Sequence, residues 1–314
     1  MIGFPMDLGA DRRGVDMGPS AVRYAGIDAK IRELGHDFTD MGDVGVPIPE
    51  RRRPGTGPKY LREIVRACER LAPRVETVLD EGGFPVVVGG DHSMAIGTVT
   101  GVASHFRKRD QRFGMLWIDA HADMNTHETS PSGNIHGMPL SALVGHGHPD
   151  LVGLGGFSPK IQPENVVLIG IRSVDEDERE VVLRSGVNCF EMMKIDARGI
   201  GAVVIEALQL ALEGVDGLHV SFDVDGVDPE YAPGVGTPVT GGLNYREAHL
   251  LMEAAADSGR LASVEMAELN PILDTRNQTG EFVCEMIVSA LGKKVMGPLF
   301  ETGRGRGMSG RGGR

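Results

Sequence analysis

The sequence predicts a single α/β domain of three layers, in which a mostly parallel sheet has helices on both faces. The first observation is that short runs rich in Val, Ile and Leu alternate with helical segments along most of the chain, which is typical of buried parallel strands. The second is that hydrophobic residues make up 41% of the chain and aromatics only 5%, which favours an aliphatic core. We expect this domain to cover residues 1–300 and a disordered Gly/Arg-rich tail to follow at 301–314.

The first third of the chain is expected to contain one short strand and two helices. Residues 1–5 resemble the end of a short strand, and a Gly-rich loop leads to a helix that is capped by Ser20 and runs through 26–34. Prolines 47, 49, 54 and 58 exclude regular structure from 44–58, which we expect to be a surface loop. Apolar residues at helical spacing then predict a long helix over 60–80 that ends at Gly82 and Gly83.

The rest of the chain alternates strands with helices. The predicted strands are 85–88, 114–118, 165–171, 218–222 and 262–267. One predicted helix begins near residue 93, and three others cover 176–185, 245–258 and 280–291.

Charge and cysteine content narrow the classes of function. A net charge of -12 argues against nucleic acid as the main partner and is compatible with a cationic small molecule. Cys68, Cys189 and Cys284 are odd in number and far apart, so we expect buried, unpaired thiols. The sequence shows neither a membrane span nor a signal peptide, and we predict a cytoplasmic protein.

Acidic and imidazole side chains follow four of the predicted strands. Ligands of open parallel sheets bind beyond the carboxyl ends of the strands, and in an extended chain Asp119, His121 and Asp123 would point the same way. The candidate metal ligands are His92, Asp119, His121, Asp123, Asp223 and Asp225, and Glu268 follows a fourth strand.

Six such groups are too many for one ion with open positions, and they suit two. Oxygen and imidazole donors without thiolate fit a hard or borderline ion such as manganese. Two ions can lower the pKa of a shared water, which predicts hydrolysis by a metal-bound hydroxide. Each residue alone could be a cap, a turn residue or a core histidine, but together they would bury several unpaired charges at high cost.

Several neighbouring features have less specific interpretations. Polar loops at 125–139 and 226–242 flank the expected metal edge, where substrate recognition tends to lie. Asp91 could support a ligand or form a turn, and Asp228 is expected to fix a turn before Pro229. The remaining histidines are expected on the surface or in the core: His105, His146, His148, His219 and His249.

Five motifs together resemble the ureohydrolase family, and within it the arginases. They are GGDHS at 89–93, DAHAD at 119–123, SGNIHG at 132–137, SFDVDGVDP at 221–229 and MAELNP at 266–271. The resemblance implies two Mn²⁺ per subunit and hydrolysis of L-arginine to L-ornithine and urea by a bridging hydroxide. It implies one ion on His92, Asp119, Asp123 and Asp223, and a second on Asp119, His121, Asp223 and Asp225.

The resemblance also implies roles around the metals. Asp123 would orient the hydroxide, Glu268 would face the guanidinium group, and His136 would pass a proton to the leaving amine, as suits imidazole. The family forms trimers or hexamers, so a homo-oligomer is expected. The implied substrate contacts are Asn125, Ser132 and Asn134 at the α-carboxylate, Asp175 and Glu178 near the α-amino group, and Thr237 as another lining residue.

Two alternative functions differ from an arginase. Another guanidino compound such as agmatine could be the substrate, but agmatinases usually lack the SGN segment present at 132–134. Ser173 stands where some relatives have Asp. A metal-binding assembly protein that has lost catalysis would be expected to lack a ligand or His136, and none is missing.

Overall fold

A computed structural model describes residues 1–48, 50 and 57–297 of the chain. The predicted tail at 301–314 and part of the predicted 44–58 loop lie outside these residues. Seven strands form one sheet in the order β1-β2-β7-β6-β3-β4-β5, and all neighbouring pairs are parallel. The strands are β1 Ile2–Phe4, β2 Val86–Gly89, β3 Phe113–Ile118, β4 Val166–Ile171, β5 Asn188–Glu191, β6 Gly217–Asp223 and β7 Leu261–Ala267.

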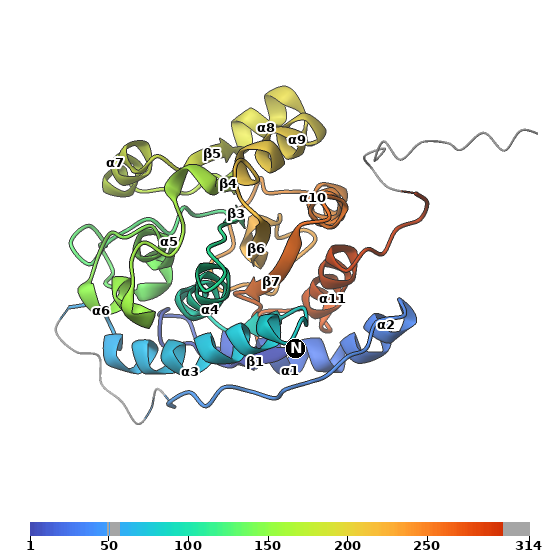
Figure 1. Ribbon diagram of the computed structural model, residues 1–314, viewed down its shortest axis with the longest axis horizontal. Coiled ribbons are helices and arrows are strands. Elements are labelled where there is room, and N and C mark those ends of the chain that lie inside the picture. The colour runs from blue at the N-terminus through green and yellow to red at the C-terminus, as the bar shows by residue number, and fades with distance from the viewer. Residues whose placement is uncertain (49, 51–56, 298–314) are drawn as a thin grey trace, which may run out of the picture.

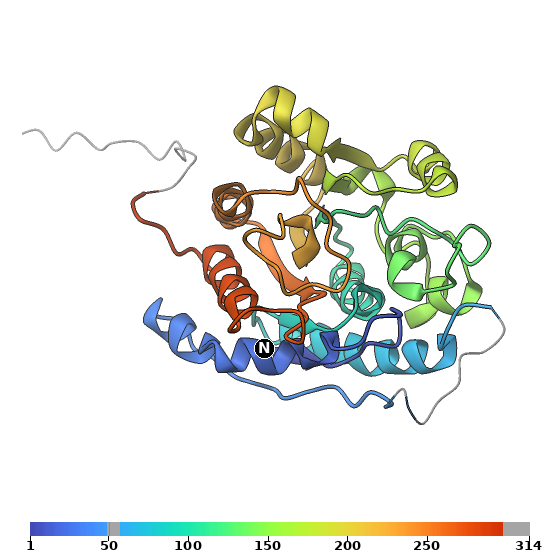
Figure 2. The same cartoon turned by 180° about the vertical axis from the view of Figure 1, so that it is seen from behind.

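Side chains that alternate along each strand enter two separate cores, which makes three layers. Met115 and Trp117 of β3 belong to the core with α3 (Leu61–Asp80) and α4 (Ala95–Arg107). Leu116 belongs to the core with α9 (Ile200–Ala211), α10 (Tyr245–Asp257) and α11 (Gln278–Ala290). The central strands accordingly lie between α4 and the pair α10 and α11 (Figures 1 and 2). The predicted three-layer α/β fold is confirmed.

Helix α3 covers the range predicted from its apolar spacing, and it packs closely on α4. A Cβ at Gly101 would lie 2.4 Å from the Ala72 carbonyl oxygen, and one at Gly97 would lie 3.0 Å from Cys68 Cα. Glycine is therefore required where the two helix backbones meet. The close packing fixes α4, and with it the turn after β2 that leads into α4.

The predicted helix through 26–34 is wrong in detail. The chain forms α1 (Gly18–Tyr24) and α2 (Ile27–Glu33), which are separated at Gly26 with φ 79°. Pro19 lies in the first turn of α1, where its missing N–H costs nothing. Ser20 is therefore inside α1 and is not its cap, since Met17 takes that position.

Residues 188–211 contain three elements that the sequence did not predict: β5, α8 (Met192–Arg198) and α9. β5 has only four residues at the sheet edge, and three of them are half-buried. A strand so short and so little buried carries almost no hydrophobic periodicity.

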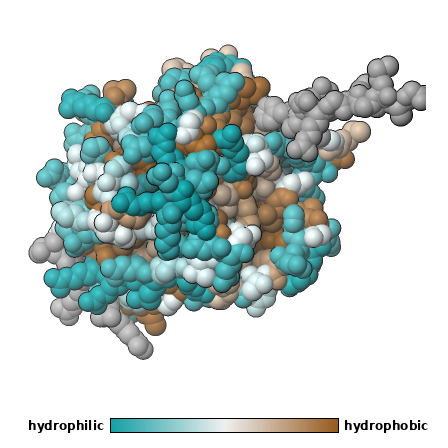
Figure 3. Space-filling view, viewed as in Figure 1, coloured by the Kyte–Doolittle hydropathy of each residue, from teal (hydrophilic) through white to brown (hydrophobic). Residues whose placement is uncertain are grey.

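The remaining helices are α5 (Pro139–Leu143), α6 (Pro149–Val152) and α7 (Glu176–Ser185). Cys68 and Cys284 are buried, Cys189 is half-buried, and all three are unpaired, as expected. Within the described residues no helix is long and apolar enough to cross a membrane. The face seen in Figure 3 is mostly hydrophilic, with hydrophobic residues in smaller groups.

Candidate metal centre and surrounding loops

The predicted ligands follow three strands that end at the same edge of the sheet. His92 lies in a turn, η3 (His92–Met94), after β2, and Asp119, His121 and Asp123 follow β3. Asp223 ends β6, and Asp225 lies in η7 (Val224–Gly226). Glu268 follows β7, which lies between β2 and β6 in the sheet.

The three ligand-type residues after β3 converge in a different way from that predicted. The strand ends at Ile118, and Asp123 has φ 52°, a left-handed conformation that non-glycine residues seldom adopt. A bend in the backbone therefore directs Asp123 back toward the site. The alternation of side chains along an extended strand does not account for its position. Such strained residues cluster at functional sites.

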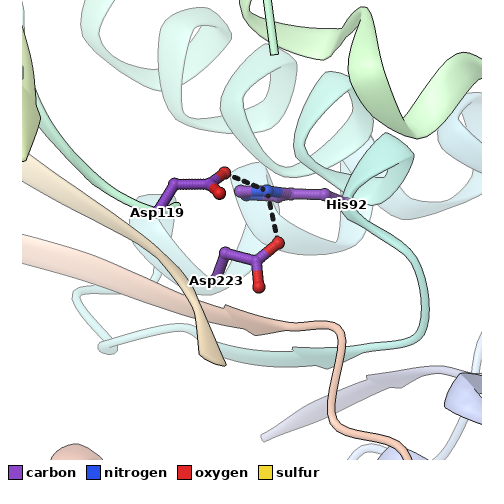
Figure 4. A group of neighbouring side chains, drawn as sticks. All are labelled: His92, Asp119 and Asp223. Atoms are coloured by element: carbon purple, nitrogen blue, oxygen red, sulfur yellow. Dashed lines mark ion pairs between the residues drawn. The ribbon is translucent and has the colours of Figure 1, made fainter. Parts of the chain in front are cut away.

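One group of side chains surrounds His92 Nδ1. This atom lies 3.2 Å from Asp119 Oδ2, 3.1 Å from Asp123 Oδ2 and 3.1 Å from Asp223 Oδ2. Figure 4 shows the imidazole between the carboxylates of Asp119 and Asp223. His92 Nδ1 is buried and has no hydrogen-bond partner, so one imidazole nitrogen and three carboxylates face one point. A divalent cation fits such a donor set.

A second group shares Asp119 with the first. His121 Nδ1 lies 3.4 Å from Asp119 Oδ1 and 3.2 Å from Asp225 Oδ2. The two oxygens of Asp119 thus face different imidazoles, an arrangement that suits a carboxylate shared by two ions. Asp223 directs one oxygen to His92, while the other accepts the main-chain N–H of Asp225 at 2.8 Å.

Without metal, the acidic groups and imidazoles of the site perturb one another. Burial raises the pKa of Asp123 to about 6, and it raises the pKa of Asp223 well above the usual value of an aspartate. Burial opposes a charged His121, but Asp225 and Asp119 outweigh it and raise its pKa to about 12. Protons on the imidazoles therefore balance the carboxylates, and a metal ion has to displace them on binding.

Two supporting contacts to the ligands were missed in the sequence. Ser221 Oγ donates to Glu265 at 2.7 Å and lies 2.8 Å from His92 Nε2. Because the hydroxyl proton of Ser221 is donated to Glu265, the Nε2–H of His92 must donate to Ser221. This leaves His92 Nδ1 free to bind metal. Trp117 Nε1 donates to Asp119 Oδ2 at 3.0 Å. Both residues lie two positions before an aspartate, which could have indicated a shared face.

His136 and Glu268 lie beside the first group. His136 Nδ1 is 3.0 Å from Glu268 Oε1, which also accepts the His92 main-chain N–H. Glu268 has φ 64°, and its buried Oε2 has no hydrogen-bond partner. Burial disfavours the charged imidazole, but Glu268 and other nearby carboxylates outweigh it and raise the pKa of His136 to about 9.

Asp91 both forms a turn and supports the site. Its Oδ1 accepts the Ser93 N–H at 3.1 Å, which begins η3, and its Oδ2 accepts the Gly9 N–H at 2.8 Å. The Gly9 carbonyl in turn accepts the main-chain N–H of His136 at 3.1 Å. Asp91 therefore links the loop after β1 to the backbone of His136.

The residues predicted at the substrate α-amino group, Asp175 and Glu178, are connected to Asn125, which is predicted at the α-carboxylate. Asn125 Nδ2 donates to Asp175 Oδ2 at 2.8 Å, and Asp175 Oδ1 accepts the Glu178 N–H at 2.9 Å. Glu178 accepts the Met124 N–H at 2.9 Å, and burial raises its pKa to about 7. Two elements, the loop after β3 and the start of α7, are thus held together.

The other predicted contacts lie on the flanking loops. Ser132 Oγ accepts the Asn134 N–H at 3.1 Å, and Asn134 Oδ1 is buried without a hydrogen-bond partner. Thr237 donates to Asp225 Oδ2 at 2.8 Å. Asp228 fixes its turn as predicted, and it also accepts the N–H groups of Gly241 and Gly242.

The fold and the two carboxylate–imidazole groups define an α/β protein with a candidate metal site at the carboxyl edge of its sheet. The arginase family model matches residues 1–292. The arginase of Bacillus caldovelox is 50% identical over 298 residues, which cover 94% of this chain and 98% of that protein. Its native structure at pH 5.6 superposes with a TM-score of 0.90, and that of Bacillus subtilis arginase with 0.87 at 49% identity, each over 94% of this chain and 98% of the other.

The chain belongs to the arginase family. The predicted enzyme class, an arginase hydrolase, is confirmed at this level, and the family together with the two groups indicates a metal cofactor. A hypothetical agmatinase from Burkholderia thailandensis is 22% identical with a TM-score of 0.70 over 92% of this chain and 83% of the other, and it shares only the fold.

Proposed function

We propose that this chain binds two Mn²⁺ ions and hydrolyses L-arginine to L-ornithine and urea. The observation that carries this proposal is Asp119, whose two oxygens face His92 in one group and His121 in the other. His92, Asp119, Asp123 and Asp223 would hold one ion, and Asp119, His121, Asp223 and Asp225 the other. The orphaned, buried Nδ1 of His92 supports the fit. Two bound ions would supply hydroxide near neutral pH.

The protein groups around the ions suit a guanidinium substrate. Glu268 Oε2 is buried and lacks a hydrogen-bond partner, so a cationic guanidinium group would satisfy it. Asp123 would orient the attacking oxygen. His136 holds a proton up to about pH 9 in the metal-free protein and would donate it to the departing amine of ornithine.

The flanking loops offer groups for both α-substituents of the amino acid. Asn125, Ser132 and Asn134 would contact the α-carboxylate. Asp175 and Glu178 would contact the α-amino group, and Thr237 would line the site beside Asp225. A site that pairs both groups discriminates against a substrate that lacks one of them.

We also propose a trimeric or hexameric assembly, which the resemblance to the family supports. The cytoplasmic location stays a prediction.

The proposal is tested by comparing L-arginine with agmatine on one preparation. The manganese-loaded protein should release urea and ornithine from L-arginine, and a metal-stripped sample should not. Agmatine should be a much poorer substrate because it lacks the carboxylate. Equal or better turnover of agmatine would overturn the substrate assignment, and no urea from either compound would overturn the enzyme assignment.

A further inference from the structure

Arg172 directly follows β4, and its guanidinium group donates to main-chain carbonyls from three segments. Nη1 lies 3.1 Å from the carbonyl oxygens of both Gly170 and Gly226. Nη2 lies 2.7 Å from those of Asp225 and Val239, and 3.5 Å from that of Val227. One planar group thus connects the end of β4, the turn after β6, and the loop that carries Thr237.

The main chain at Arg172 also contacts the segment after β3, which carries Asp119 and His121. The N–H groups of Arg172 and Ser173 donate to the Ala120 carbonyl at 2.9 and 3.0 Å. Ala120 lies between Asp119 and His121, and its own N–H donates to Asp225 Oδ1 at 3.2 Å. Arg172 therefore joins the two segments that supply the second group, Asp119, His121 and Asp225.

The surrounding backbone is shaped to admit the guanidinium group. Gly170 has φ 96°, and the pairing of β4 with β5 shifts register there. A Cβ at Gly242 would lie 2.5 Å from Arg172 Nη2. Lysine offers a single charged point on a flexible chain and cannot bridge this spread of acceptors, whereas arginine presents a fixed fork.

Two of the four ligands of the first group, His92 and Asp223, lie outside these contacts. His92 is fixed through its own main-chain N–H by Glu268 and through its ring by Ser221. Asp223 is the last residue of β6 and is held by pairing with β7. The second group lies wholly in the segments that Arg172 connects, whereas the first group has only Asp119 and Asp123 in them.

We propose that Arg172 is a positioning residue that assembles the binding site for the second ion. This inference rests on the proposed two-ion function and names the residue on which one of the two sites depends. The Arg172 side chain donates to main-chain carbonyls, that of Asp225 among them, and its own N–H donates to the carbonyl of Ala120, so it would act on the ligands through the backbone.

The charge of Arg172 and its proposed positioning role predict opposite effects on metal binding when the residue is removed. A cation close to Asp225, Asp119 and Asp223 repels a second cation, so by electrostatics alone its removal should tighten metal binding. If Arg172 positions the ligands, its removal should weaken binding of the second ion more than binding of the first. The sign of the effect separates the two explanations.

The test titrates Mn²⁺ alone into the metal-free full-length protein, followed by calorimetry and by electron paramagnetic resonance. Wild type should take up two ions and show the spectrum of a coupled pair. Arg172→Gln and Arg172→Lys should bind the first ion within about twofold of wild type and the second at least about 10-fold more weakly. Their spectra should be those of an isolated ion at concentrations that fill both sites in wild type.

Arg260→Gln is the matched control. Arg260 also donates to a main-chain carbonyl, that of Val215 at 2.5 Å. Val215 precedes the N-terminal end of β6, which is the end opposite to Asp223. Thermal unfolding of each metal-free variant checks its fold. Unchanged or tighter binding of the second ion in both Arg172 variants would overturn the positioning role. Uptake of fewer than two ions by wild type would instead overturn the two-ion function.

Discussion

His136 and Glu268 show how a single ion pair can serve both stability and chemistry. Their side chains meet at 3.0 Å beside the candidate metal groups, and Glu268 is fully buried. Because the pKa of His136 is raised to about 9, the imidazole carries its proton throughout the neutral range. It can therefore act as an acid where an ordinary histidine would be mostly neutral.

His136→Asn should keep both metal ions and lower turnover by about 10²- to 10⁴-fold, since a positioned proton donor contributes on that order. Metal analysis and the urea assay on one preparation check this. Full turnover across the pH range would remove His136 from proton transfer.

The pair also predicts a pH dependence of the metal-free protein. The folded-state pKa of His136 lies above its ordinary value, so the protonated imidazole stabilises the fold fully below about pH 6.5. This contribution is lost as the pH rises through about 9. The free energy of unfolding of wild type relative to His136→Asn, measured with denaturant, should shrink from pH 6 to pH 10. A difference that grows over this range would contradict the assignment.

At the scale of elements, the carboxyl ends of the strands could be predicted because buried parallel strands are continuous apolar runs. His92, Asp119 and Asp223 lie at or just after the ends of those runs, so they could be predicted together with the strands. Asp123 reaches the site through a left-handed turn that no alternation rule describes. Arg172 acts through contacts with segments about 50 or more residues away, and nothing local in the sequence reveals them. Ser221, by contrast, could have been found from its position two residues before Asp223.

The start of α7 combines a helix cap with a predicted substrate contact. Asp175→Ala should cost about 0.5–2 kcal/mol of stability as a lost cap, and it should also raise KM for L-arginine. Asn244→Ala is the control, because Asn244 caps α10 and has no predicted substrate contact. It should cost similar stability and leave KM unchanged. A KM effect of equal size in both variants would show that the substrate effect is merely structural.

At the scale of the molecule, the candidate metal ligands follow three strands of one sheet. Ions held at the ends of β2, β3 and β6 would connect elements that are otherwise linked through the backbone pairing of the sheet. Metal ions that bind the folded chain but not the unfolded chain stabilise it by mass action. Removing metal with a chelator should therefore lower the melting temperature, and Mn²⁺ should restore it. A melting temperature that does not respond to either would contradict a metal site built from the folded sheet.

The most direct test of the two-ion arginase is urea release from L-arginine as Mn²⁺ is added stepwise to the metal-free protein. The account predicts that activity rises mainly as the second equivalent per chain is bound and then reaches a plateau. Full activity with one equivalent, or in metal-stripped protein, would contradict it.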